Sequence, residues 1–238
     1  MEKCKEHYLG FFRAYWDLYE LPAKSPNAMV IVEPRQHSDL EFVIKNTAYF
    51  CPGWSLWVFA SEENIEFVKS LLGHNLSRTN IIIFTKGNIT INQYNNLLLN
   101  RKFWELIDAE RCLIFQTDTI IRRFGINEFM EYDYIGAPWP HKNNRIGNGG
   151  LSLRRRTEMI SAINNQSCIS VENEDEFFSR WIYRDGSTSI VPSYETALSF
   201  SVENIYHPNS LGAHQLFKWS QYPDLLSNLC RMNINIQF

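Results

Sequence analysis

Apolar positions in the first half of the chain form short runs that alternate with segments of helical periodicity. Residues 28–33 read AMVIVE, a β-branched apolar run that is typical of a buried strand. Residues 39–50 carry apolar side chains at helical spacing behind Asp39, a residue type that caps helices. The same alternation predicts further strands at 53–61, 80–87 and 112–118, and further helices at 63–72 and 90–107.

Four strand–helix alternations predict the α/β class, with a mostly parallel central sheet and helices on both of its faces. We expect one domain over residues 28–220, with an N-terminal aromatic helical extension at 1–27 and a C-terminal tail at 221–238. In such sheets, ligands bind beyond the carboxyl ends of the strands. Asp118 ends the fourth predicted strand, so it is a candidate ligand-binding carboxylate, with a plain strand-end cap as the alternative.

After residue 130 the pattern changes to a predicted loop of turn formers and aromatic residues at 131–140. Glycines at 147, 149 and 150 permit either a close approach of backbone to a ligand or an ordinary tight turn. Residues 174–176 place three carboxylates in a row before an aromatic helical stretch. The arginines at 154–156 favour a solvated helix start, with a grip on phosphate as the alternative.

Composition and charge narrow the class of protein. The 238 residues are 45% hydrophobic, enough for one sizeable domain with a core. A net charge of −3 argues against a general nucleic-acid binder. The chain has no apolar run near the roughly 20 residues that cross a bilayer, and its N-terminus lacks a signal-peptide pattern. We therefore expect no transmembrane segment, no nucleic-acid partner and a cytoplasmic location. The five cysteines form no C-x-x-C pair, which predicts neither a disulfide framework nor a zinc knuckle.

Several phosphate-binding and catalytic signatures are absent from the sequence. It contains no G-x-G-x-x-G after the first strand, no G-x-x-x-x-G-K-[ST] and no G-x-S-x-G. A dinucleotide site, a P-loop and a nucleophile elbow are therefore not expected. A divalent metal held by a strand-end carboxylate is the other way to bind phosphate, and Mg²⁺ and Mn²⁺ prefer oxygen ligands.

The segment before residue 28 carries six aromatic side chains on a broad apolar face at helical spacing. Such a helix most often packs on its own domain. A partner or membrane-surface role is the alternative, and the few basic residues there argue against anionic lipid.

Eight segments in order carry a family resemblance: VIVEPR, GWSLWVF, YNNLLLNRKFW, LIFQTDT, YDYIGAPW, GNGGLSLRRR, NEDEFF and GAHQLFKW. With them the chain resembles the nucleotide-sugar-dependent glycosyltransferases of the GT-A fold. It is most similar to a family of small glycosyltransferase-like domains, of mostly unassigned specificity, from bacteria, eukaryotes and large DNA viruses.

The resemblance implies a single GT-A (Rossmann-like) domain and an inverting, metal-dependent glycosyltransferase of the hexosyltransferase class. The donor would be a nucleoside-diphosphate sugar, a UDP-sugar foremost and a GDP-sugar as the alternative, and the acceptor a glycan or glycoconjugate. The second reading is a nucleotide-sugar-binding or scaffold module without turnover. A sugar-nucleotide pyrophosphorylase would want a glycine-rich basic loop after the first strand, which residues 33–39 do not supply.

The resemblance also assigns roles to residues on the metal side. The triplet Gln116-Thr117-Asp118 matches the D-x-D motif that binds a metal on the donor diphosphate, but only its last position is a carboxylate. Asp118 and His214 are the implied ligands of Mn²⁺ or Mg²⁺, and a solvent-facing turn residue is the alternative for His214.

On the acceptor side, Asp175 is the implied catalytic base, with Glu174 as a further catalytic or acceptor-binding carboxylate. A charge favoured at a helix N-terminus is the alternative for Asp175. Trp139 would stack on an acceptor ring, or else pack in the core. The implied donor-binding residues are Glu33, Arg35, Asn95, Gln116, Thr117, Asp118, Asn148, Gly149 and Gly150.

Overall fold

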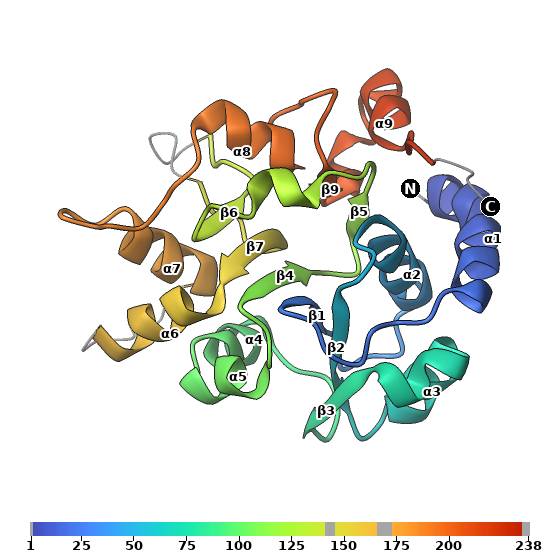
Figure 1. The fold of residues 1–238 in the computed structure, drawn as a ribbon. Coiled ribbons are helices and arrows are strands. Elements are labelled where there is room, and N and C mark those ends of the chain that lie inside the picture. The colour runs from blue at the N-terminus through green and yellow to red at the C-terminus, as the bar shows by residue number, and fades with distance from the viewer. Residues whose placement is uncertain (1, 141–145, 166–172, 235–238) are drawn as a thin grey trace.

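A computed structural model describes residues 2–140, 146–165 and 173–234. Its centre is a six-stranded sheet with the strand order β3-β2-β1-β4-β7-β6 (Figure 1). Strands β3, β2, β1 and β4 are parallel, whereas β7 runs antiparallel to both β4 and β6. The predicted α/β class with a mostly parallel sheet is confirmed. The strands are β1 Asn27–Val32, β2 Ser55–Ser61, β3 Asn80–Thr85, β4 Arg111–Phe115, β6 Tyr134–Gly136 and β7 Leu151–Arg155.

Helices cover both faces of this sheet, so β1, β2 and β4 contribute alternate side chains to two cores. In β1, Met29 and Ile31 belong to one core, and Val30 belongs to the other. This two-sided burial explains why the strands read as continuous apolar runs. The first core is covered by α1 Glu2–Leu18, α2 Leu40–Phe50 and α3 Ile65–Leu72. The second is covered by α4 Ile91–Leu98, α5 Arg101–Leu106, α6 Arg156–Asn165 and α7 Glu174–Ile182.

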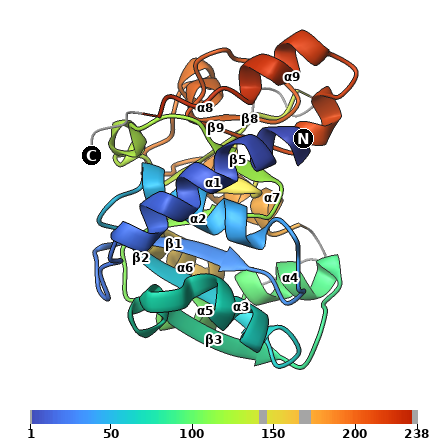
Figure 2. The ribbon, with the colours of Figure 1, turned by 90° about the vertical axis from the view of Figure 1, so that its right-hand side faces the viewer.

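The aromatic N-terminal helix α1 lies across α2 and the first core (Figure 2). Phe12 is fully buried and makes an edge-to-face contact with Phe42, with ring centroids 5.7 Å apart. Trp16 is buried as well, and its indole N–H donates to the carbonyl of Leu72 at 3.1 Å. The aromatic face of this helix therefore packs on its own chain. No described helix is long and apolar enough to cross a membrane.

A smaller sheet, ordered β5-β9-β8, continues from the end of β4. Its strands are β5 Thr119–Ile121, β8 Ser201–Val202 and β9 Gly212–His214. A turn joins β4 to β5, because the Thr119 amide donates to the Gln116 carbonyl at 3.1 Å. Thr119 pairs with His214 across the antiparallel β5–β9 ladder. This pairing brings a residue from near the end of the chain beside the triplet that follows β4.

Arg122, just after β5, fixes the C-terminal part of the chain to this small sheet. Its side chain is buried and donates to the carbonyls of Pro208, Ser210 and Asn228. The remaining elements are α8 Tyr194–Phe200, α9 Pro223–Leu229 and the 3₁₀ helices Gly73–Arg78, Ile126–Phe129 and Leu216–Trp219.

Two sequence-based helix predictions needed correction. The predicted helix at 90–107 is divided into α4 and α5, because the Asn100 side chain accepts from the Lys102 amide and caps a second helix. The helix start at Thr90 is a reciprocal capping box with Gln93. Asp39 precedes α2 but makes no capping hydrogen bond, and it forms an ion pair with Lys5 instead.

The region after β4 was predicted as loop and solvated helix, and this was wrong in two places. Residues 134–136 form strand β6 within the predicted loop, paired with β7. Arg154 and Arg155 lie in β7, and only Arg156 begins a helix. Arg154 is fully buried. The run of arginines therefore includes part of an internal strand, and the charge of Arg154 is neutralised by a residue elsewhere in the fold.

Candidate active site

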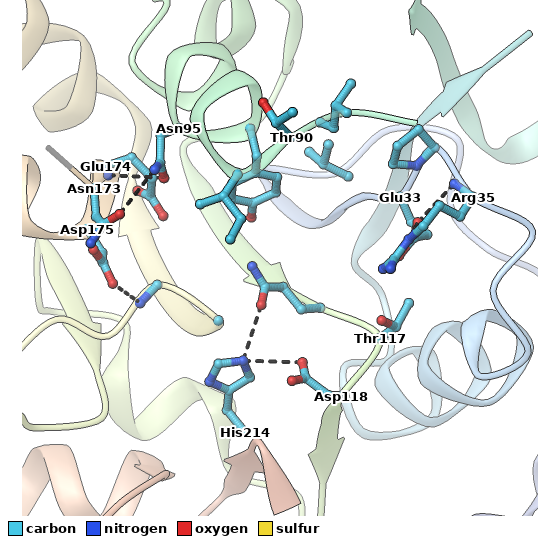
Figure 3. A pocket seen from close by; sticks show the side chains of 18 of the residues that line it. Glu33, Arg35, Thr90, Asn95, Thr117, Asp118, Asn173, Glu174, Asp175 and His214 are labelled. Carbon is cyan, nitrogen blue, oxygen red and sulfur yellow. Dashed lines mark hydrogen bonds and ion pairs between the residues drawn. The ribbon is translucent and has the colours of Figure 1, made fainter. Parts of the chain in front are cut away.

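A cavity of about 600 Å³ opens beyond the carboxyl ends of β1 and β4, where the strand pattern predicted a ligand site. Its size lies within the range of small-molecule sites. Three groups of side chains surround it: Asp118 with His214, Asp175 with Glu174, and Glu33 with Arg35 (Figure 3). They come from segments far apart in the sequence, which the two sheets bring together.

The first group is built on the turn between β4 and β5. Asp118 Oδ1 lies 3.2 Å from His214 Nε2. The same ring nitrogen lies 3.2 Å from Gln116 Oε1 (Figure 3). The structure therefore places Asp118, His214 and the first residue of the triplet together. Thr117 is buried and also lines the cavity.

Asp118 is held in its charged form. Burial raises the pKa of this carboxyl, but the contributions that lower it, led by the hydrogen bond and the charge of His214, together outweigh burial. The charge of Lys5 acts in the same direction, so the pKa lies below its ordinary value. A carboxylate that stays ionised is suited to bind a cation or the hydrogen-bond donors that surround a bound diphosphate.

The second group stands at the start of α7. The Asp175 carboxylate accepts from two backbone amides, Gly149 N at 3.1 Å and Glu176 N at 2.8 Å. Desolvation by burial raises the pKa of Asp175 to about 7, and the charge of Glu174 adds to the effect. The hydrogen bonds from Gly149 and Glu176 and the charge of Arg154 oppose it. A carboxyl group poised near neutrality suits proton transfer at physiological pH.

Glu174, next to Asp175, is engaged by Arg154. The guanidinium of Arg154 donates to both carboxylate oxygens, at 2.5 and 3.0 Å, and both side chains are buried. The same guanidinium lies 4.9 Å from the ring centroid of Tyr134. This bidentate pair gives Glu174 a supporting position beneath Asp175, and its expected role in acceptor binding stays a prediction.

The third group lies at the end of β1, on the other side of the cavity (Figure 3). Arg35 Nε and Nη2 donate to the two oxygens of Glu33 at 2.8 and 2.7 Å. The Arg35 amide also donates to Glu33, at 2.9 Å. Glu33 is buried and Arg35 is half exposed, so the pair presents a fixed guanidinium to the cavity.

The remaining predicted residues fall into two sets. Asn95 and Asn148 line the cavity, but each also fixes local backbone. The Asn95 side chain accepts from the Glu174 amide at 3.3 Å, and the Asn148 side chain accepts from the Gly150 amide at 3.1 Å. Trp139 is only 7% exposed and is not among the residues that line this cavity. Its expected role as an acceptor platform stays a prediction.

Gly149 and Gly150 line the cavity between the first two groups. A Cβ atom on Gly149 would lie 2.4 Å from Glu174 Oε1. A Cβ on Gly150 would lie 2.1 Å from the His214 ring. Both positions therefore exclude any larger residue without displacement of a neighbour.

Ten of the residues that line the cavity were not predicted from the sequence, and Tyr94 and Gln215 are two of them. Burial raises the pKa of the Tyr94 hydroxyl, the charge of Glu174 adds to this, and a hydrogen bond from Gln116 opposes it. Tyr94 thus lies between the first two groups, and its place beside Asn95 on the same helix was the available signal. Gln215 adopts a left-handed conformation with φ of 54°, which is uncommon outside glycine. No local sequence pattern indicates that conformation.

Comparisons with solved structures bear on the fold. The apo-form glycosyltransferase GlyE from Streptococcus pneumoniae TIGR4 aligns with a TM-score of 0.50 at 13% sequence identity. The alignment covers 88% of this chain and 61% of that chain, so this chain spans less than two thirds of its neighbour. HddC from Yersinia pseudotuberculosis aligns with a TM-score of 0.38 at 12% identity, over 57% of this chain and 79% of that one. The GlyE similarity shows a glycosyltransferase-like fold, and the HddC score is too low to add to it.

A search of curated proteins finds no match. A family model described as "Protein of unknown function (DUF5672)" matches residues 78–214. This range includes β3, the turn at residues 116–118, α7 and β9. Since the match covers more than half of the sequence, the chain belongs to this family.

Proposed function

We propose that the protein is a metal-dependent inverting glycosyltransferase that moves a sugar from a nucleoside-diphosphate sugar to a hydroxyl acceptor. One observation carries the proposal: two carboxyl groups with opposite pKa shifts face one cavity. The pKa of Asp118 is lowered, whereas that of Asp175 is raised to about 7. When the pKa values of two carboxyl groups are shifted apart, one group can stay charged while the other transfers a proton.

The residues around His214 fit a divalent metal. Two oxygens, Asp118 Oδ1 and Gln116 Oε1, each lie 3.2 Å from His214 Nε2, an arrangement that a shared proton or a cation satisfies. Carboxylate and amide oxygens are ligand types that Mn²⁺ and Mg²⁺ accept. When bound, the metal would neutralise charge on the leaving nucleoside diphosphate.

The incomplete D-x-D triplet limits what the protein supplies to that metal. Among the described residues, no group of three or more His, Cys, Asp or Glu side chains is placed to hold a metal ion. Asp118 and His214 would be the main protein ligands, and the neutral amide of Gln116 would be a third ligand. The remaining ligands would be phosphate oxygens of the donor, as is common for Mg²⁺.

Asp175 would act as the general base. It would remove the proton of the acceptor hydroxyl while that oxygen forms a bond to the anomeric carbon. The bond from this carbon to the diphosphate oxygen breaks at the same time, and the diphosphate leaves with the electron pair. A single displacement of this kind inverts the anomeric configuration. The backbone amides of Gly149 and Glu176 orient the carboxylate for the task.

The donor would lie between the three groups. Its nucleotide would meet Arg35, whose guanidinium is fixed by Glu33, and its sugar would meet the backbone at Asn148, Gly149 and Gly150. We favour a UDP-sugar as donor, with a GDP-sugar as the alternative, and a glycan or glycoconjugate as acceptor.

The test is a panel of UDP- and GDP-sugars with Mn²⁺, with Mg²⁺ and with a chelator, scored by calorimetry and by release of nucleoside diphosphate. Asp118→Asn should abolish metal-dependent donor binding and leave the fold intact. Asp108→Asn is the matched control, because that side chain is 79% exposed and remote from the cavity. Equal metal-dependent affinity in Asp118→Asn and native protein would remove Asp118 from the site, and an NMR coupling constant for a retained configuration would refute inversion.

A donor-binding module without turnover is the second candidate. The observation that favours it is Gln116 at the position where D-x-D has its first carboxylate. The same panel separates the two: tight binding of one donor without any release of nucleoside diphosphate, with or without acceptors, would establish the module.

A further inference from the structure

The N-terminal helix α1 supplies a buried cation beside the candidate site. Lys5 is only 4% exposed. Its ammonium group donates to Asp39 Oδ2 at 2.6 Å and to the carbonyl of Thr117 at 3.0 Å. It also lies 5.7 Å from the ring centroid of Phe42. Burial of an ammonium group is unfavourable unless it is paired and hydrogen-bonded, so the two short contacts define where Lys5 can reside.

The Thr117 carbonyl belongs to the peptide group that joins Thr117 to Asp118. Lys5 therefore holds the peptide on the N-terminal side of Asp118. The peptide on its C-terminal side is held as well, because the Gln215 amide donates to the Asp118 carbonyl at 3.2 Å. The turn that presents Asp118 is thus fastened from two directions, by α1 and by the residue that follows β9.

Lys5 is not needed to attach α1 to the domain. The buried aromatic side chains Phe12 and Trp16 already dock this helix. A second ion pair, Arg13 with Glu41, joins α1 to α2 at 2.5 Å with the arginine side chain 55% exposed. The two pairs connect the same two segments, but only Lys5 continues to the backbone of the triplet.

We propose that Lys5 is a positioning residue for the Asp118 turn, so that α1 forms part of the candidate donor site although it lies outside the residues that the family model matches. The proposal rests on the proposed function for its consequence, which is weaker binding of donor and metal when the turn is released. Its structural part, that Lys5 immobilises the turn, is independent of any ligand.

The test uses Lys5→Met in the full chain, with Arg13→Met as the matched control. The first readout is hydrogen exchange of the Thr119 amide, whose bond to the Gln116 carbonyl closes the turn. We expect its protection to fall at least tenfold in Lys5→Met and to stay within twofold in Arg13→Met. Equal protection in Lys5→Met and native protein would overturn the proposal, whether or not a nucleotide binds.

The second readout is the affinity for UDP or GDP with Mn²⁺, measured by calorimetry. Where the native protein binds, we expect a loss of at least tenfold in Lys5→Met and less than twofold in Arg13→Met. A faster-exchanging turn with unchanged affinity would overturn the role in the donor site. If the native protein binds neither nucleotide, the proposed function fails and the exchange result alone decides the role of Lys5.

A double variant covers the case in which Lys5→Met is poorly folded. Lys5→Met combined with Asp39→Asn removes both charges, so no carboxylate is left without its partner. Faster exchange at Thr119 in this variant supports the proposal, and native-like exchange overturns it.

Discussion

Replacement of Asp175 with asparagine should stabilise the folded protein at neutral and basic pH while it removes the proposed base. Asparagine has nearly the same shape as aspartate but carries no charge. In the native protein this charge is unfavourable, because burial and the neighbouring Glu174 raise the pKa of Asp175 from 3.8 to about 7. The hydrogen bonds from Gly149 and Glu176 favour the charged form, and the value of about 7 already includes them.

The magnitude follows from linkage between protonation and folding. The two pKa values, about 7 and 3.8, differ by about three, and each unit corresponds to about 1.4 kcal/mol. The folded state holds the proton more tightly than the unfolded state, so the free energy of unfolding falls as pH rises from about 4 to about 7. At pH 8 Asp175 should therefore destabilise the protein by about 4 kcal/mol relative to an uncharged side chain. At pH 5 the cost is about 2 kcal/mol, because the folded state keeps a proton that the unfolded state releases.

The assay is urea denaturation of native protein and Asp175→Asn at pH 5 and pH 8. We expect the variant to be more stable at both, with a gap about twice as large at pH 8. Asp108→Asn should show no such pH-dependent gap, because that side chain is exposed. Transfer by Asp175→Asn should fall by roughly 10²–10⁴. A variant that is no more stable than native protein at pH 8 would refute the reasoning.

Three further predictions concern neighbouring residues. Arg154→Met should destabilise the fold by about 3–5 kcal/mol in urea denaturation, since it leaves Glu174 buried without a partner, and Glu174→Gln in the same chain should restore most of the loss. Gln116→Asp completes the D-x-D triplet and should raise affinity for free Mn²⁺ about tenfold or more by electron paramagnetic resonance, a gain of about 1.4 kcal/mol; no gain would argue against the triplet as a ligand. Trp139→Ala should cost about 3–5 kcal/mol of stability with acceptor KM unchanged, and a raised KM with native stability would favour the acceptor platform instead.

The sequence was sufficient for the parallel part of the fold. Strands β1, β2 and β4 are buried on both faces, and β3 is partly exposed at the edge of the sheet. All four carry apolar runs, a local signal that needs no knowledge of neighbours. Strand β6 has only three residues and β7 ends in arginines, so neither carries such a signal. Arg154 can lie in a strand because Glu174, 20 residues away, neutralises it inside the fold.

The candidate site shows the same division between local and long-range information. Asp118 was predictable because it follows a recognisable strand. Its contact with His214 depends on the pairing of β5 with β9, which places Thr119 opposite His214 across 95 positions of sequence. Lys5 reaches Thr117 across 112 positions of sequence, and no spacing rule indicates such a contact.

The glycines at 149 and 150 show how a local pattern can indicate importance without its reason. Their sequence suggested either a tight turn, which uses the freedom of glycine backbone, or a close approach of backbone to a ligand, which uses the absence of a side chain. Of the glycines in this segment, only Gly147 has a positive φ. At Gly149 and Gly150 the requirement is space, since a Cβ would meet Glu174 at one position and His214 at the next. Two adjacent glycines thus let a single strand of backbone pass between the proposed base and the proposed metal ligand. A substitution at Gly149 should therefore disturb the proposed base, and a substitution at Gly150 should disturb the proposed metal ligand.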